Sequence, residues 1–255
     1  MTVVFAAGVL LPQNLGVTEY FRKTREAFPN AQFPEVPTVA AISDRATALA
    51  GQLINYAGPI HIIAHSMGGL DVRHLLSHDL RGLASSGRVA SLSMIATPNF
   101  GSPIADVLAG PKPSILNLPL WTLYNTLVDL AAKINLFLAA ASNLTTQYLT
   151  QTFNPQTPNV GSVKYYCYAG SGLESLVLTA SRDWIASFGQ TPDEKANDGL
   201  VSVKSASWTP LAEPAWDTAD HASEIGHTLN PPTIISAFDH IATYRRILAR
   251  AGVQS

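Results

Sequence analysis

The sequence predicts an α/β protein in which a mostly parallel central sheet is covered by helices on both faces. Short apolar and β-branched runs, typical of buried strands, alternate along the 255-residue chain with segments of helical spacing. Hydrophobic residues make up 47% and charged residues 13% of the chain, which supports a large core and argues against disorder. Since no linker interrupts the sequence, we expect a single domain over residues 1–255.

The strands are predicted from apolar runs that are too short to favour helices. Residues 2–7 form a β-branched run that ends at Gly8, and residues 59–64 and 89–96 have the same character. Together they indicate a sheet buried on both faces. Further predicted strands cover residues 36–41, 163–169 and 200–203.

The helices are predicted from apolar residues that recur with helical spacing. Residues 43–56 open with Ser43 as N-cap and carry Ala46, Leu49 and Leu53 along one face. This pattern indicates a helix with one side on the core. Further predicted helices cover residues 17–28, 67–76 and 233–250.

Ser66 stands between a predicted strand and a predicted helix, in the segment AHSMGG. A serine at such a sharp turn has a strained backbone and an exposed hydroxyl, and small residues two positions before and after it relieve crowding. Ala64 and Gly68 occupy those positions. The helix N-terminus also directs the Met67 amide toward negative charge on an attacked carbonyl oxygen. The alternative is a packing turn of small residues, but its context favours Ser66 as a nucleophile.

A histidine must take the proton of a nucleophilic serine. His221 lies in a polar loop, whereas His240 falls in the last predicted helix, so a loop histidine is the better base. The alternative is that His221 is a solvated surface histidine. The other histidines are His61, His65, His74 and His78, near the serine in sequence, and His227.

A carboxylate must orient that histidine, and α/β-hydrolases place it between the serine and the histidine in sequence. Asp198 meets this condition in an Asn-Asp-Gly turn beside a predicted strand. The same tripeptide is common in ordinary turns, so spacing alone leaves the assignment open. The rival carboxylates are Asp183, Asp193, Asp217 and Asp220.

Several short blocks follow one another in the order known from one enzyme family. They are Gly8-Val9, Leu15-Gly16-Val17, Tyr20-Phe21, AHSMGG, Thr97-Pro98, Gly101-Ser102, Ala105-Asp106, Asn197-Asp198-Gly199-Leu200-Val201 and His221-Ala222-Ser223-Glu224-Ile225. Through them most of the chain resembles the bacterial triacylglycerol lipases of the Pseudomonas and Burkholderia type, which have the α/β-hydrolase fold. The resemblance implies Ser66 as nucleophile, Asp198 as acid and His221 as base. It also implies an oxyanion hole made by the amides of Val9 and Met67.

The chain departs from that family in ways that bear on cofactors. Ala7-Gly8 replaces a His-Gly pair, and the single cysteine, Cys167, excludes the family's disulfide. The family's structural calcium takes an aspartate two residues after the catalytic histidine, where this chain has Ser223. If Asp183 matches the other ligand, one carboxylate remains for an ion that takes about six to eight oxygens. The sequence therefore argues against calcium, and we expect no required cofactor.

An insertion over about residues 103–155 is rich in leucine, alanine and aromatic residues. Its residues 120–138 predict a one-sided helix. Permanent packing on the core would explain this pattern, but its place after the strand that follows the nucleophile resembles a lipase lid over an acyl groove. Its polar stripe is Thr122, Asn125, Thr126, Asp129 and Lys133, and its apolar face is Leu120, Leu123, Tyr124, Leu127, Leu130, Ile134 and Phe137.

Charge and hydropathy limit the partners. The formal net charge is −2 and the basic residues are scattered, so we expect no nucleic-acid partner. No apolar run predicts a transmembrane segment, and the first residues lack the positive region of a signal peptide. We expect either an intracellular protein or a secreted one without its leader, acting on an ester or lipid at an oil–water interface.

Several functions agree with these residues. The first is a lipase that cleaves triacylglycerol or other medium- and long-chain esters. A short-chain esterase, a polyester depolymerase or an acyltransferase would use the same nucleophile. A catalytically inactive hydrolase fold that binds lipid is disfavoured, because Ser66, Asp198 and His221 are all present.

Overall fold

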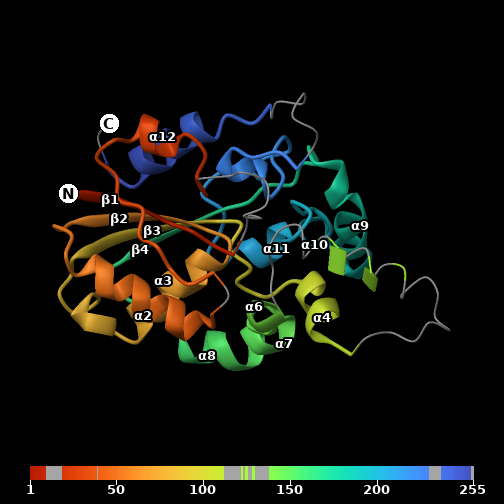
Figure 1. The fold of residues 1–255 in the computed structure, drawn as a ribbon, viewed down its shortest axis with the longest axis horizontal. Helices are drawn as coiled ribbons and strands as arrows, with labels where there is room; N and C mark the ends of the chain where they lie inside the picture. Colours follow the sequence, from red (N-terminus) through yellow and green to blue (C-terminus); the bar gives the residue numbers. More distant parts are fainter. Residues whose placement is uncertain are drawn as a thin grey trace.

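The computed structural model of the chain describes residues 1–9, 19–38, 40–111, 122, 124–125, 128–129, 138–229 and 237–253. Within these residues, four strands form one parallel sheet in the order β1-β2-β3-β4. The strands are β1 Thr2–Ala6, β2 Ile60–His65, β3 Val89–Ile95 and β4 Lys164–Tyr168. Helices lie on both sides of this sheet (Figure 1), which confirms the predicted fold class.

The helices connect and cover the strands. The α-helices are α1 Thr24–Ala27, α2 Ile42–Leu53, α3 Met67–Ser77, α4 Pro103–Ala109, α6 Leu138–Ser142, α7 Thr146–Tyr148, α8 Asn154–Gln156, α9 Thr179–Phe188, α10 Pro192–Lys195, α11 Val203–Ala206 and α12 His240–Arg250. Short 3₁₀ turns are η2 Leu80–Gly82, η4 Leu176–Leu178 and η5 Ser223–Ile225, and η3 Leu149–Phe153 is a π-helical turn. Within the described part of the chain, no helix has the length and apolarity needed to span a bilayer.

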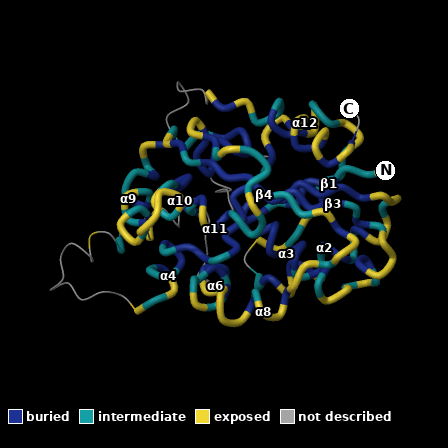
Figure 2. Tube along the Cα trace, turned by 180° about the vertical axis from the view of Figure 1, so that it is seen from behind, coloured by how far each residue is buried: buried dark blue, intermediate teal, exposed yellow. Residues whose placement is uncertain are grey.

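Alternate residues of the strands belong to different cores because neighbouring side chains point to opposite faces of a sheet. Val4, Ile62 and Leu92 pack in the core that includes α2 and α3. Phe5 and Ile63 pack in the core that includes α12, on the other face (Figure 1). The sheet is therefore buried on both sides, as Figure 2 shows for its central strands.

Two of the six predicted strands are wrong. Residues 36–38 and 40–41 form no strand, because the free edge of β1 is already occupied by Gln32, which exchanges backbone hydrogen bonds with Val3 and Phe5. Residues 200–202 lie in a turn closed by one antiparallel bridge between Asn197 and Ser202, and Val203 begins α11. The other four predicted strands are confirmed.

The predicted helices over 43–56 and 67–76 are confirmed as α2 and α3, but α2 begins at Ile42 with Ala41 as its N-cap, so the prediction of Ser43 as N-cap is wrong. The helix predicted over 17–28 is reduced to α1, and residues 17–18 lie outside the described residues. α12 begins at His240, where the Asp239 side chain accepts the Ala242 N–H at 2.9 Å, and residues 233–236 of the predicted helix lie outside the described residues. Most of the helix predicted over 120–138 also lies outside them.

Two glycines let the start of α3 approach the strands closely. A Cβ on Gly68 would lie 2.6 Å from the carbonyl oxygen of Ala6, and a Cβ on Gly69 would overlap the Thr97 side chain. Contacts this short require the backbone to move. These glycines therefore hold α3 against the carboxyl ends of β1 and β3.

We expect Gly69→Ala to destabilise the protein by about 1–3 kcal/mol, because the added methyl group overpacks the contact with Thr97. Gly51→Ala is the matched control, since Gly51 also lies in a helix but a Cβ there meets nothing within 4 Å. We expect this control to stabilise by about 0.5–1 kcal/mol through helix propensity. Urea unfolding of both variants measures the two effects, and equal effects would contradict the packing argument.

Candidate active site

The backbone at Ser66 has the strained geometry expected of a sharp strand–helix turn. Its φ of 56° and ψ of −133° place a non-glycine residue at positive φ between β2 and α3. Gly8 lies directly opposite, where a Cβ would come within 2.7 Å of the Ser66 Cβ. The absence of a side chain at Gly8 thus leaves room for Ser66.

Ser66, His221 and Asp198 are brought together in one hydrogen-bonded chain. His221 Nε2 lies 3.1 Å from Ser66 Oγ, and His221 Nδ1 lies 2.6 Å from Asp198 Oδ2. All three residues are buried. They are 23 to 155 residues apart in sequence, so the tertiary fold alone creates this contact.

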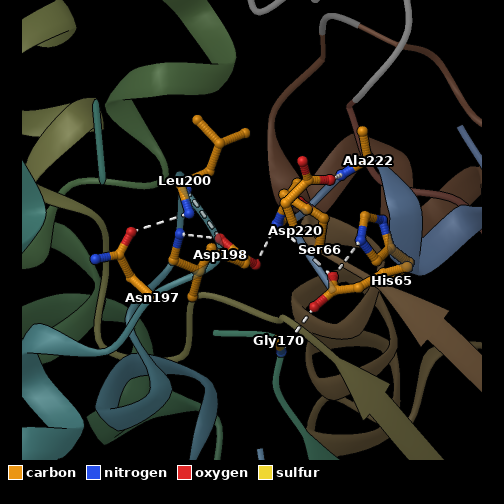
Figure 3. A network of polar contacts seen from close by, with 12 residues as sticks. His65, Ser66, Gly170, Asn197, Asp198, Leu200, Asp220 and Ala222 are labelled. Carbon is orange, nitrogen blue, oxygen red and sulfur yellow. Dashed lines mark hydrogen bonds and ion pairs between the residues drawn. The ribbon is translucent and has the colours of Figure 1, made fainter. Parts of the chain in front are cut away.

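The loop around Asp198 (Figure 3) is arranged around its carboxylate. Asp198 Oδ1 accepts the backbone N–H groups of Leu200 at 2.8 Å and Val201 at 2.7 Å. The His221 N–H in turn donates to the Asp198 carbonyl oxygen at 3.0 Å. These bonds explain why the chain turns back after Asp198 instead of forming a strand. They also hold the loop of Asp198 against the loop of His221.

The rival carboxylates and histidines have other positions. Asp183, Asp193 and Asp217 are exposed, whereas buried Asp220 accepts three backbone N–H groups of the neighbouring turns. His227 Nε2 lies 3.0 Å from the Glu19 carbonyl oxygen, and His240 Nε2 lies 2.8 Å from that of Arg22. Both histidines thus hydrogen-bond the backbone of residues 19–22 and not Ser66.

Val9 and Met67 are the residues whose amides are expected to form the oxyanion hole. Met67 is the first residue of α3, so its N–H belongs to the free donors of the helix N-terminus. Val9 follows Gly8 at the end of the β1 loop and lines the cavity beside Ser66. Both residues are buried.

A buried ion pair that the sequence analysis missed supports this loop. Arg45 Nη2 donates to the carbonyl oxygens of Ala7 at 2.8 Å and Gly8 at 3.3 Å, and Arg45 Nε donates to Asp71 Oδ2 at 2.9 Å. Burial raises the pKa of Asp71 to about 6, and the charge of Arg45 opposes this effect. Arg45 lies four residues before Leu49 on the buried face of α2, and a charge on that stripe was the available signal.

A second polar network lies beside the serine–histidine–aspartate chain (Figure 3). His65 Nε2 lies 3.0 Å from Glu224 Oε2, and His65 Nδ1 lies 2.8 Å from the hydroxyl of Tyr20. Glu224 Oε1 accepts the Gly170 N–H at 2.8 Å. Burial lowers the pKa of His65 well below its ordinary value and raises the pKa of Glu224 well above its own.

The cavity beside Ser66 is lined mainly by apolar residues. Its walls come from the loop after β1, the segment from β3 into α4, the residue run after α6, and the loop after Asp198. The lining residues are Val9, Ser66, Pro98, Ser102, Ile104, Ala105, Leu144, Leu200, Val201 and His221.

The calcium site implied by the family resemblance does not fit these residues. The Ser223 hydroxyl accepts the Asp220 N–H at 2.8 Å, and Asp183 is exposed on α9. Among the described residues, one group of histidine and acidic side chains is compact enough for a metal ion: His65, His221 and Glu224. With two imidazoles and one carboxyl, it lacks the oxygen ligands that calcium prefers.

Solved structures with the same architecture are lipases and esterases. Lipase BlEst2 of Bacillus licheniformis in its mature form has a TM-score of 0.68 and 19% identity, and the match covers 98% of this chain and 91% of that chain. The lipase of Staphylococcus hyicus has a TM-score of 0.67 and 17% identity, with 98% and 96% covered. The chain has the α/β-hydrolase fold. The metagenomic carboxyl esterase MGS0156 shares this α/β-hydrolase fold at a TM-score of 0.62 and 20% identity, with 87% and 64% covered.

Sequence comparison also finds a lipase among the proteins that this chain resembles. No family model matches the chain. Triacylglycerol lipase 2 of Saccharomyces cerevisiae is 30% identical over an alignment of 183 residues, and the match covers 68% of this chain and 51% of the yeast protein. The chain therefore spans about half the length of this relative.

Removing the charge of Arg45 should destabilise the protein strongly. We expect Arg45→Met to lower the free energy of unfolding by about 3–5 kcal/mol at pH 8, because Asp71 is left buried without its partner. A carboxyl group whose pKa is higher in the folded than in the unfolded state makes the folded protein less stable as the pH rises. This loss of stability begins near the unfolded pKa, about 4, and continues through the folded pKa. The loss should therefore be smaller at pH 5, where more of Asp71 is protonated.

The double variant R45M/D71L is the control for this ion pair. We expect it to recover part of the lost stability at pH 8, since no buried charge remains, although the carbonyl oxygens of Ala7 and Gly8 stay without their donor. Denaturant unfolding at both pH values provides the measurement. A loss for R45M that is equal at pH 5 and pH 8 would show that the charge of Asp71 does not cause it.

Proposed function

We propose that the chain is a serine carboxylic-ester hydrolase with Ser66 as nucleophile, His221 as base and Asp198 as acid. The observation that carries the proposal is the hydrogen-bonded chain from Ser66 through His221 to Asp198, next to an apolar cavity. The printed names of the yeast relative and the structural neighbours, which are lipases and esterases, support it.

The proposed reaction has two acyl-transfer steps. His221 Nε2 takes the proton of Ser66 Oγ as that oxygen attacks the ester carbonyl carbon, and returns it to the leaving alcohol. Water then attacks the acyl-enzyme in the same way and releases the acid. Asp198 stabilises the positive charge that His221 carries in each transition state, and it fixes Nδ1 as the protonated nitrogen.

The amides of Val9 and Met67 are proposed to stabilise the oxyanion. Arg45 draws the Gly8 carbonyl oxygen toward α2. In a trans peptide the C=O and the next N–H point in opposite directions, so this contact turns the Val9 N–H away from Arg45. Arg45 would thus keep the Val9 donor in place before substrate binds, which is the condition for oxyanion stabilisation without reorganisation.

The substrate proposal rests on the cavity. Its apolar lining suits an acyl chain, so we propose a lipase acting on triacylglycerol or other medium- and long-chain esters at an oil–water interface.

Membership of the Pseudomonas and Burkholderia type and a lid over about residues 103–155 are part of this proposal. The lid's key apolar residues, Leu127 and Phe137, lie outside the described residues. A short-chain esterase, a polyester depolymerase and an acyltransferase remain as alternatives with the same nucleophile.

Ser66→Ala tests the nucleophile. We expect the variant to fold as the wild type does and to lose at least about 10³-fold in kcat/KM for p-nitrophenyl esters, because the acyl-enzyme cannot form. Ser93→Ala is the matched control: Ser93 is a buried serine of β3, and its loss should leave the rate within a few-fold. An S66A enzyme that keeps wild-type activity would refute the proposal.

The acyl-chain preference tests the substrate class. We expect initial rates with p-nitrophenyl esters from acetate to palmitate to favour the longer chains, and emulsified triglyceride to be hydrolysed, because the cavity lining is apolar. Activity confined to soluble short-chain esters would identify an esterase. Added alcohols or polyester would reveal acyl transfer or depolymerisation by their products.

A further inference from the structure

A second carboxyl group reaches the imidazole of His221. Glu224 is fully buried, and its Oε2 lies 4.0 Å from His221 Nδ1, which already contacts Asp198 at 2.6 Å. The same oxygen lies 3.0 Å from His65 Nε2 (Figure 3). The charge carried by Glu224 therefore bears directly on His221, whose role as base belongs to the proposed function.

The three buried carboxyl groups near His221 differ in how many donors surround them. Asp198 accepts two backbone N–H groups and faces His221, and Asp220 accepts three backbone N–H groups, from Ser175, Ala222 and Ser223. Several donors to one carboxylate favour its ionised form. Glu224 accepts a single backbone N–H, from Gly170.

The groups that face Glu224 add no compensating positive charge. Among the described residues, its ion-pair partners are two histidines, His65 and His221. From α12, the Tyr244 hydroxyl donates to the Glu224 carbonyl oxygen and not to the carboxyl group. The acidic groups of Asp198 and Asp220 also lie close enough to act on the Glu224 carboxyl. Burial and these carboxylates raise the pKa of Glu224, while burial lowers the pKa of His65.

We propose that Glu224 is an uncharged carboxylic acid paired with an uncharged His65, so that His221 faces one anion, Asp198, instead of two. In this arrangement Glu224 Oε2 donates its proton to His65 Nε2, and His65 Nδ1 donates to the Tyr20 hydroxyl oxygen. Glu224 Oε1 remains the acceptor for the Gly170 N–H. Glu224 and His65 are positioning residues that act on the base through its electrostatic surroundings.

Neutrality of this pair matters for proton transfer. A second anion 4.0 Å from His221 Nδ1 would favour the imidazolium form of His221, which cannot accept the Ser66 proton. A charged His65, whose ring centroid lies 4.6 Å from that of His221, would oppose the positive charge that develops during the reaction. An uncharged pair avoids both effects and extends activity toward acidic pH.

The acidic limb of the pH dependence of kcat/KM tests the charge. In Glu224→Gln the side chain stays uncharged, its amide can donate to His65, and its carbonyl can accept the Gly170 N–H. We expect the half-maximal pH of this limb to stay within about 0.3 units of the wild type. An ionised Glu224 would instead predict a downward move of about one unit or more, since charges 4 Å apart interact strongly.

Glu213→Gln is the matched control for this pH profile. Glu213 pairs with Arg246 and Arg250, and its loss should not move the acidic limb. A downward shift seen in E224Q but not in E213Q would overturn the proposal. A shift of the same size in both variants would also count against it, because the limb would then report general charge.

A direct measurement keeps the proposal testable apart from the hydrolase function. In protein labelled with ¹³C at the glutamate carboxyl carbon, we expect one resonance, absent from E224Q, to remain in the protonated position at pH 7. A resonance that titrates near the ordinary glutamate pKa of about 4.3 would overturn the proposal. If E224Q does not fold, an atomic-resolution structure of the wild type decides: unequal Cδ–Oε bond lengths support the uncharged acid, and equal lengths contradict it.

Discussion

The close contact between the start of α3 and the ends of β1 and β3 is the constraint on which the site depends. Gly68 and Gly69 permit this contact, and the chain between β2 and α3 then has to turn within one residue. Ser66 makes this turn with a positive φ, which is a strained backbone conformation for a residue other than glycine. Such strain persists only when the surrounding structure fixes the backbone conformation. The position of the proposed nucleophile thus depends on how closely α3 packs against the sheet.

Charged groups support the residues on which the proposed reaction of Ser66 depends. Asp198 lies against His221 on one side, and Arg45, paired with Asp71, holds the loop of Val9 on the other. Among the buried carboxylates, Asp71 is paired with Arg45, and Asp198 and Asp220 each accept several backbone N–H groups, as burial in a low-dielectric interior requires. In the arrangement we propose, Glu224 is the exception that resolves its burial by remaining protonated.

Prediction from sequence succeeded where the determining interactions are local. The strand, turn and helix around Ser66 lie within some twenty consecutive residues, so their pattern was visible in the chain. The contact of Ser66 with Asp198 and His221 is made by loops far apart in sequence, and local patterns left several rival acids and bases. Resemblance to a family narrowed that choice, and the structure brings those three side chains together.

The predictions that the structure contradicts, and the groups that the sequence does not reveal, also depend on contacts made by the tertiary fold. Residues 200–203 are apolar enough for a strand, but the Asp198 carboxylate accepts the backbone N–H groups of Leu200 and Val201 and turns the chain. The pairing of Arg45 with Asp71 leaves little trace in the sequence because charges on helices are usually solvated, and the contact of His65 with Glu224 joins residues far apart in the chain. Only the packing of separate elements reveals that these groups are buried and paired.

The central claim is that Ser66 attacks an ester carbonyl between the amides of Val9 and Met67. The most direct test is a crystal structure of the protein after reaction with an alkyl phosphonate ester, which mimics the tetrahedral intermediate. We expect phosphorus bonded to Ser66 Oγ, with a phosphonyl oxygen within about 3 Å of both amides and the alkyl chain in the apolar cavity. Failure of the reagent to react, or attachment to another residue, would contradict it.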